Sequence, residues 1–153
     1  MKTATQPQGC TNFKLRQLMR QVTRLYDLEL ARAGLKTTQY SLLSHVLHLG
    51  PLRPVDLAQA MGLTASTLTR NMQPLVAAGW IELGEGPDAR SRMVHLTDIG
   101  RAKRTEAQRR WKAAQLQLND KLGEPRVAAL HALIDESLAL LGPQDEAQGD
   151  NDE

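Results

Sequence analysis

Residues 54–83, PVDLAQAMGLTASTLTRNMQPLVAAGWIEL, contain the pattern that decides the fold. The stretch predicts a short helix over 54–60, a tight turn around Gly62, and a second helix over about 65–78 that Thr64 caps. Glycine suits the turn because it takes a left-handed backbone conformation at no steric cost. The stretch therefore predicts two helices joined by a tight turn.

The second helix of this pair has one apolar and one polar face. Helical spacing places Ala65, Leu68, Met72, Leu75 and Val76 on the inner face, and Ser66, Thr69, Arg70 and Gln73 on the other. Pro74 lies well inside the helix, where it removes a backbone hydrogen bond. We expect a kink there, with a break as the lesser alternative.

A β-hairpin is predicted directly after these helices. Residues 80–83 and 93–96 alternate between apolar and polar as strands do, and the segment GEGPDARSR between them is rich in turn residues. Arg90 and Arg92 make the tip of this hairpin basic. Helix, glycine turn, helix and basic hairpin together predict a winged helix-turn-helix unit.

The residue types on this unit suit DNA. Small polar side chains at the start of a helix let it approach base edges in the major groove, and arginine and glutamine can bind guanine and adenine. The hairpin arginines could reach phosphate or a narrow minor groove. The candidate contacts are Thr64, Ser66, Thr67, Thr69, Arg70, Gln73, Arg90 and Arg92. Two alternatives stay open, since some winged helices bind only protein and a basic hairpin can be a solvated loop.

Four more helices are predicted outward from this unit. Apolar residues recur at helical spacing over about 12–33, from a cap at Thr37 or Thr38 to Gly50, from a cap at Thr97 or Asp98 to Gly123, and from Pro125 to Gly142. The fold class is therefore mainly α, with six helices, a small β-hairpin wing and additional helices on both sides of the winged unit. We expect the flanking helices to hold more apolar surface than the winged unit alone needs.

Composition limits the class of protein. The 153 residues suit one domain, and a single cysteine excludes an intrachain disulfide or a cysteine-rich zinc site. No apolar run is long enough for a membrane span or a secretion segment, so a cytoplasmic protein with no membrane partner is expected. Residues 1–11 are predicted to be a flexible arm.

The net charge of +2 conceals an asymmetry. The last twelve residues, 142–153, contain five acids and no base, so residues 1–141 carry 19 bases against 12 acids, a formal charge of +7. An acidic segment without apolar residues is predicted to be a disordered tail. The basic body suits a polyanionic partner.

The chain resembles the MarR family of winged helix-turn-helix regulators over about 12–141. The resemblance rests on LAQAMGLTASTLTRNMQPL, on AAGWI, and on Asp88-Ala89-Arg90-Ser91-Arg92 followed by LTDIGR. It implies one MarR-like domain, with the helix-turn-helix and wing at about 51–97 and dimerisation helices at about 12–33 and 98–141. It further implies a homodimer on a pseudo-palindromic double-stranded operator, with Asp88 orienting an arginine and Arg90 or Arg92 entering the minor groove.

The family resemblance implies two ways of sensing a signal. A phenolic or other aromatic acid could bind between the dimerisation helices and the winged unit, with candidate contacts at Arg16, Arg20, Tyr40, His45, His48 and Trp111. Alternatively, Cys10 could be a peroxide-sensing thiol near Tyr26 of a partner subunit. Cys10 falls about two residues before the family's sensing cysteine, and Arg16 stands where a further tyrosine is expected, so an idle thiol is the third reading.

Neither a cofactor nor a metal is expected. His45 and His48 share a helical face, but no nearby residue completes a metal site. The chain has no nucleophile elbow, phosphate loop or dinucleotide fingerprint, which leaves an enzyme based on Cys10 as a minor alternative. The sequence favours a non-enzymatic transcriptional regulator, a repressor released from its operator by a small effector.

Overall fold

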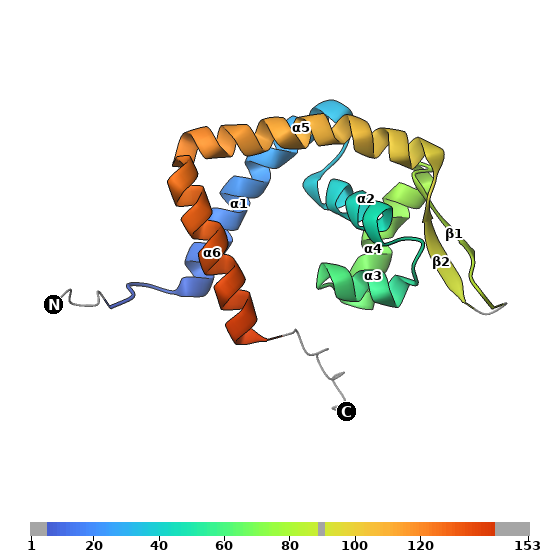
Figure 1. Ribbon diagram of the computed structural model, residues 1–153, viewed down its shortest axis with the longest axis horizontal. Helices are drawn as coiled ribbons and strands as arrows, with labels where there is room; N and C mark the ends of the chain where they lie inside the picture. The colour runs from blue at the N-terminus through green and yellow to red at the C-terminus, as the bar shows by residue number, and fades with distance from the viewer. Residues whose placement is uncertain (1–5, 89–90, 143–153) are drawn as a thin grey trace.

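Six α-helices, one short 3-10 helix and a two-stranded hairpin form the part of the chain that the computed structural model describes, residues 6–88 and 91–142 (Figure 1). The elements are α1 (Thr11–Leu30), the 3-10 helix η1 (Ala31–Ala33), α2 (Thr37–Leu49), α3 (Pro54–Met61), α4 (Ala65–Ala77), β1 (Ile81–Glu85), β2 (Arg92–Leu96), α5 (Asp98–Leu122) and α6 (Glu124–Leu141). The predicted mainly α class with a β-hairpin is confirmed.

The long helix α5 joins two parts of the molecule. Figure 1 shows α2, α3, α4 and the hairpin gathered beneath one end of α5, whereas α1 and α6 extend from its other end. α5 contacts both α1 and α2, so it is packed against each part. This arrangement places the hairpin and the start of α6 at opposite ends of α5 (Figure 1).

The core lies in the part that contains the helix-turn-helix. Its fully buried side chains come from every element around it: Leu30, Leu42, Leu43, Val46, Leu57, Leu68, Leu75, Ile81 and Val94. Burying each of these aliphatic side chains contributes about 1.5–3 kcal/mol. α5 adds Ala107, which is also fully buried, and its small side chain allows α5 to lie close to the core.

The helix-turn-helix follows the predicted pattern closely. Gly62 ends α3 in the left-handed conformation, with φ 64°, and Thr64 caps α4 through a bond from the Thr67 N–H. α4 continues through Pro74 to Ala77, so the alternative of a broken helix is wrong. The predicted inner face was too wide: Leu68, Met72 and Leu75 are buried, but Ala65 is exposed and Val76 is 42% exposed, because α4 packs on the core with a narrow stripe.

The hairpin is longer at its tip than predicted. β1 and β2 are antiparallel with Ile81 opposite Leu96 and Glu85 opposite Arg92. Leu52, between α2 and α3, bonds to Val94 through both backbone groups, at 2.8 and 3.4 Å. The base of the hairpin is thereby attached to the helix-turn-helix part.

Helix caps resolve two open sequence predictions. Thr97, rather than Asp98, caps α5, because its Oγ1 accepts the Gly100 N–H at 3.0 Å. For α2 neither predicted threonine is the cap, since the helix begins at Thr37 after Lys36, whose N–H donates to the Gln39 side chain at 2.9 Å. Thr37 instead donates its N–H and its hydroxyl to Asp27 of α1, a long-range contact that sequence cannot show.

α1 and α6 leave large apolar side chains open to solvent. The most exposed on α1 are Phe13, Leu15, Met19 and Leu28, and those on α6 are Leu133, Leu138, Leu140 and Leu141, each at least 56% exposed. Among the residues that the structure describes, no helix combines the length and apolar character needed to cross a membrane. The predictions for residues 1–5 of the arm and 143–153 of the tail lie outside the described residues.

Candidate nucleic-acid interface

The first turn of α4 is held by hydroxyl groups. Thr64 Oγ1 accepts the Thr67 N–H at 3.2 Å and lies 2.9 Å from the Thr67 hydroxyl and 3.3 Å from that of Ser66. Two of the candidate contacts, Thr64 and Thr67, therefore have a capping role in the chain as it stands. The cap fixes the start of α4, where unpaired backbone N–H groups and the positive end of the helix dipole favour an anion.

The outer face of α4 presents a row of polar side chains. Ser66, Thr69, Arg70 and Gln73 are exposed, whereas Leu68, Met72 and Leu75 anchor the opposite face in the core. Thr69 donates its hydroxyl to the Ala65 carbonyl at 3.0 Å, which leaves its oxygen able to accept. Within residues 6–88 and 91–142, Arg70 has no carboxylate within ion-pair distance, so its guanidinium is available to a ligand.

The hairpin tip is shaped by the residues around the predicted arginines. Asp88 Oδ1 accepts the Ser91 N–H at 2.8 Å, and the Gly86 N–H donates to the Ser91 carbonyl at 2.8 Å. Arg92 lies on β2 and is exposed. Arg90 lies outside the described residues, so the predicted pairing of Asp88 with an arginine stays a prediction.

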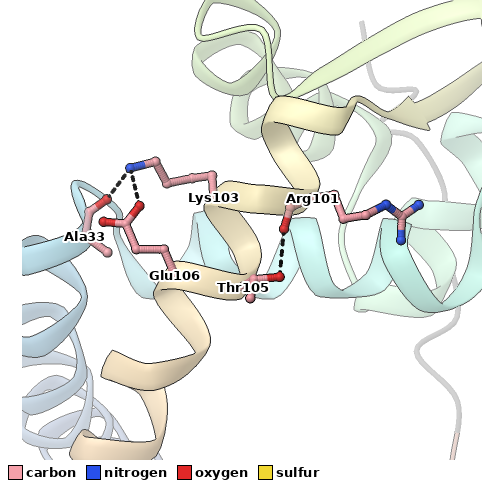
Figure 2. A network of polar contacts seen from close by, with 5 residues as sticks. All are labelled: Ala33, Arg101, Lys103, Thr105 and Glu106. Atoms are coloured by element: carbon pink, nitrogen blue, oxygen red, sulfur yellow. Dashed lines mark hydrogen bonds and ion pairs between the residues drawn. The ribbon is translucent and has the colours of Figure 1, made fainter.

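A lysine on α5 connects the base of the hairpin to the end of η1. Lys103 Nζ donates to the Ala33 carbonyl at 2.9 Å and to Glu106 Oε2 at 3.1 Å (Figure 2). The same Nζ lies 5.7 Å from the centre of the Trp80 ring, within range of a cation–π interaction. Sequence reasoning missed Lys103, because nothing in its local pattern distinguishes it from a solvated lysine.

Two of the predicted effector residues meet between α2 and α5. The rings of Tyr40 and Trp111 stack with centroids 6.2 Å apart and planes 24° apart. Arg104 lies 5.5 Å above the Tyr40 ring, with Nε bonded to Ser44 at 3.2 Å and Nη1 to Gln108 at 3.3 Å. Arg104 is half-buried and has no carboxylate partner among the described residues. Arg104 lies two helical turns before Trp111 on α5, so the two side chains share one face of the helix. Sequence reasoning overlooked this signal.

The other predicted effector residues lie apart from this pair. Arg16 and His48 are exposed, and His45 Nδ1 lies 2.7 Å from the Ser41 carbonyl of its own helix. Arg20 lines a hollow of about 450 Å³ on α1, whose other lining residues all belong to that helix. The described part of a single chain thus brings together Tyr40 and Trp111, and does not bring the remaining four to them.

The two residues of the redox hypothesis are far apart in one chain. Cys10 is exposed just before α1, whereas the Tyr26 hydroxyl donates to Gln115 Oε1 of α5. Sixteen residues of helix separate them by about 24 Å. Burial raises the pKa of Tyr26 above its ordinary value. Any contact between Cys10 and Tyr26 would need a second chain, and the hypothesis stays untested.

Metal ligands do not gather in the part of the chain that the structure describes. No three His, Cys, Asp or Glu side chains lie close enough there to hold an ion. His45 is engaged with its own helix backbone and His48 points from an exposed position, so the pair gains no third ligand.

A helix-turn-helix followed by a basic hairpin defines the winged helix-turn-helix class. The model of the MarR family matches residues 33–91. The transcriptional regulator MosR of M. tuberculosis, solved in complex with DNA, is 30% identical, with 84% of this chain and 96% of that one aligned and a TM-score of 0.72. The chain belongs to the MarR family.

Two further proteins are similar to this chain, one in sequence and one in fold. An uncharacterized HTH-type transcriptional regulator of Bacillus subtilis, YwoH, is 27% identical over 84 residues, which cover 55% of this chain and 61% of that protein. The transcriptional repressor CouR, solved with p-coumaroyl-CoA, shares the fold with a TM-score of 0.77 at 18% identity, over 88% of this chain and 96% of that one. The match to YwoH thus spans less than two thirds of that regulator's length.

Proposed function

We propose that this protein is a transcriptional regulator that binds a pseudo-palindromic DNA operator as a homodimer. The observation that carries the proposal is the exposed polar row of α4, in which Arg70 and Gln73 follow a capped helix start. An α-helix fits the major groove, and these side chain types match the hydrogen-bonding edges of guanine and adenine. The relative solved with DNA, MosR, supports the same mode of binding.

The wing would add contacts to the DNA backbone. Asp88 and Ser91 hold the turn at its tip, and Arg92 is exposed on β2. We propose that Arg90 and Arg92 contact phosphate or the minor groove, with Asp88 as their positioning residue. In this division, residues 51–97 read DNA and the helices at 12–33 and 98–141 hold the dimer together.

The open apolar faces of α1 and α6 support the homodimer. Leucines on α6 are as much as 86% exposed, and large apolar patches left in water are rare in monomeric proteins. A two-fold dimer would bury the same patch on both copies. It would also set two α4 helices about one turn of DNA apart, roughly 34 Å.

The contact between α2 and α5 supports an effector site for an aromatic acid. Tyr40 and Trp111 offer aromatic surface, and the half-buried Arg104 lacks a carboxylate. The acyl group named in the CouR complex, p-coumaroyl, is a phenolic acyl group. We propose that such an effector releases this protein from its operator, which would make it a repressor. A ~100-fold change in DNA affinity requires about 2.7 kcal/mol of differential binding.

Replacing Arg70 by alanine tests the DNA proposal. We expect the affinity for the operator to fall by about 10–100-fold, because a bidentate contact between arginine and guanine contributes about 1–3 kcal/mol. Fluorescence anisotropy with the promoter adjacent to the gene measures the change. Arg109→Ala on α5 is the matched control, since Arg109 is also exposed and does not lie on α4.

The same titration separates the alternatives. A winged helix that binds only protein would show no salt-dependent affinity for DNA in any variant, contrary to the proposal. Release of DNA by peroxide that is lost in Cys10→Ser would favour the redox alternative. Release by an aromatic acid that is lost in Arg104→Gln would favour the effector site.

A further inference from the structure

The charges of the two ends of the chain are opposite. Residues 1–26 contain five bases and no acid, whereas residues 127–153 contain seven acids and no base. The described residues include no ion pair between these ends, because all four ion pairs involve Arg32, Arg53, Lys103 or Arg110. Among the described residues, Arg16, Arg20, Arg24, Asp135 and Glu136 therefore belong to no ion pair.

The basic end forms a row on α1. Arg16, Arg20 and Arg24 follow at four-residue spacing, are all exposed, and span about 12 Å along one side of the helix. Like charges at this spacing repel one another and destabilise the helix unless an anion compensates them. We call these three residues the arginine row.

Two hollows border the arginine row. One, of about 450 Å³, is lined by Met19, Arg20, Thr23, Arg24, Asp27 and Leu28. The other, of about 370 Å³, lies between α1 and α5, with Arg24 and Lys121 among mainly apolar lining residues. Asp27 is the one carboxylate that lines either hollow, and its Oδ1 already accepts two hydrogen bonds from Thr37, at 2.7 and 2.6 Å. The surface therefore suits a segment that is both acidic and partly apolar.

The C-terminal end of the same chain has that character. Leu138, Leu140 and Leu141 are exposed at the end of α6, and the eleven residues that follow Gly142 contain five acids. Eleven residues can extend about 36 Å, roughly three times the length of the arginine row. The number of acids and the available length are therefore sufficient to neutralise all three arginines.

We propose that residues 143–153 of a second copy bind the arginine row on α1, so that the acidic tail contributes to dimerisation. This inference rests on the proposed homodimer, in which burial of the α6 leucines against the other copy brings its tail to α1. A second copy is favoured over the same chain because Leu138, Leu140 and Leu141 are exposed. Their exposure means that the end of α6 does not pack against α1 of its own chain. DNA is the less favoured anion, since α1 and the hairpin lie at opposite ends of α5 (Figure 1).

The experiment compares three variants with the full chain. One lacks residues 143–153, one carries Arg16→Gln, Arg20→Gln and Arg24→Gln, and one combines both changes. Sedimentation equilibrium gives the dimer dissociation constant at about 0.05 and 0.5 M salt, between which screening of exposed charges rises strongly. A control with Arg101→Gln, Arg109→Gln and Lys112→Gln removes the same charge from exposed positions on α5.

We expect the deletion and the arginine row variant to lose the same part of the dimer affinity. The deletion and the arginine row variant should each weaken the dimer about 10-fold at low salt and remove most of its salt dependence, because both break the same ion pairs. The combined variant should lose no more than either alone, and the α5 control should behave as the full chain. Circular dichroism confirms that each variant retains its helices.

Three results would overturn the inference. An unchanged dimer constant in the deletion, or losses that add up in the combined variant, would place the tail elsewhere. In a third case the arginine row variant would lose DNA affinity with its dimer constant intact, and the row would then bind phosphate. A full chain that stays monomeric at every concentration would instead contradict the homodimer itself, so the two failures are distinguishable.

Discussion

Gly100 determines how closely α5 approaches the base of the hairpin. It is buried in the first turn of α5, and a Cβ placed on it would lie 1.9 Å from the Trp80 carbonyl oxygen. That oxygen also accepts the Thr97 N–H at 3.1 Å and cannot move without breaking the bond. The absence of a side chain is therefore a condition for the packing of α5 on the wing.

Gly100→Ala should lower the free energy of unfolding by about 1–3 kcal/mol, because the clash with backbone outweighs the better helix propensity of alanine. Urea denaturation followed by circular dichroism measures the loss. Ile99→Ala is the control, since Ile99 is 65% exposed and its truncation should cost less than about 0.5 kcal/mol. Equal stability of Gly100→Ala and the unmodified chain would contradict the close approach.

Tyr26 gives a pH-dependent contribution to stability. Burial raises its pKa above the ordinary value of about 10, so the folded state holds the phenol proton more tightly than the unfolded state. This contribution is complete below pH 10 and is lost as the pH rises through the folded pKa. We expect the free energy of unfolding to fall more steeply above pH 10 in the unmodified chain than in Tyr26→Phe. Parallel curves for the two proteins in alkaline urea titrations would refute the assignment.

At the scale of elements, Thr97 joins the end of the hairpin to the start of α5. Its hydroxyl donates to the Gly79 carbonyl at 2.6 Å and accepts the Gly100 N–H at 3.0 Å. One side chain thus satisfies the cap of a long helix and a carbonyl at the exit of α4. The sequence pattern located this junction to within one residue, but the contact with Gly79 is tertiary.

Thr97→Val should therefore destabilise the protein by about 1–2 kcal/mol, the usual cost of losing a helix cap. Thr105→Val is a matched control, because the Thr105 hydroxyl donates only to the Arg101 carbonyl within α5, at 3.0 Å (Figure 2). That change should cost less than about 0.5 kcal/mol. Thermal unfolding of both variants measures the difference. A larger loss of stability in Thr105→Val than in Thr97→Val would contradict the proposed contribution of the Thr97 hydroxyl.

At the scale of the whole molecule, α5 joins the helix-turn-helix and its hairpin to the flanking helices α1 and α6. Lys103 reaches both the Ala33 carbonyl at the end of η1 and the Trp80 ring at the base of the hairpin. A change in how α1 and α6 pack in a dimer would therefore act on the position of the hairpin through α5. In the proposed homodimer, α5 would be the route by which an effector near Arg104 alters the spacing of the two α4 helices.

Replacing Leu138 by aspartate should weaken the proposed dimer by at least about 100-fold, since each copy would lose the burial of a leucine and place a charge in the interface. Leu138 is 61% exposed in the single chain, so the fold itself should tolerate the change. Leu49→Asp is the control: it is 51% exposed, but lies at the end of α2. Analytical ultracentrifugation measures both, and an unchanged dimer in Leu138→Asp would place the interface away from α6.

The amino-acid sequence by itself determined the elements and the class. Hydrophobic periodicity, Gly62 and Thr64 predicted the helix-turn-helix, and alternation predicted the hairpin, because these signals act between residues close in the chain. The polar row of α4 was predicted for the same reason. The exposure of Val76 was not, since the width of a buried stripe depends on the neighbouring elements.

Only the tertiary structure decided which distant residues meet. It brought Arg104 over Tyr40, Thr37 against Asp27, and Lys103 between η1 and the hairpin, and it left four predicted effector residues away from the Tyr40 and Trp111 pair. Local patterns carry no information on such pairs, because the contact depends on how whole helices pack. The unpaired charges and open leucines of α1 and α6 became visible as surfaces for the same reason.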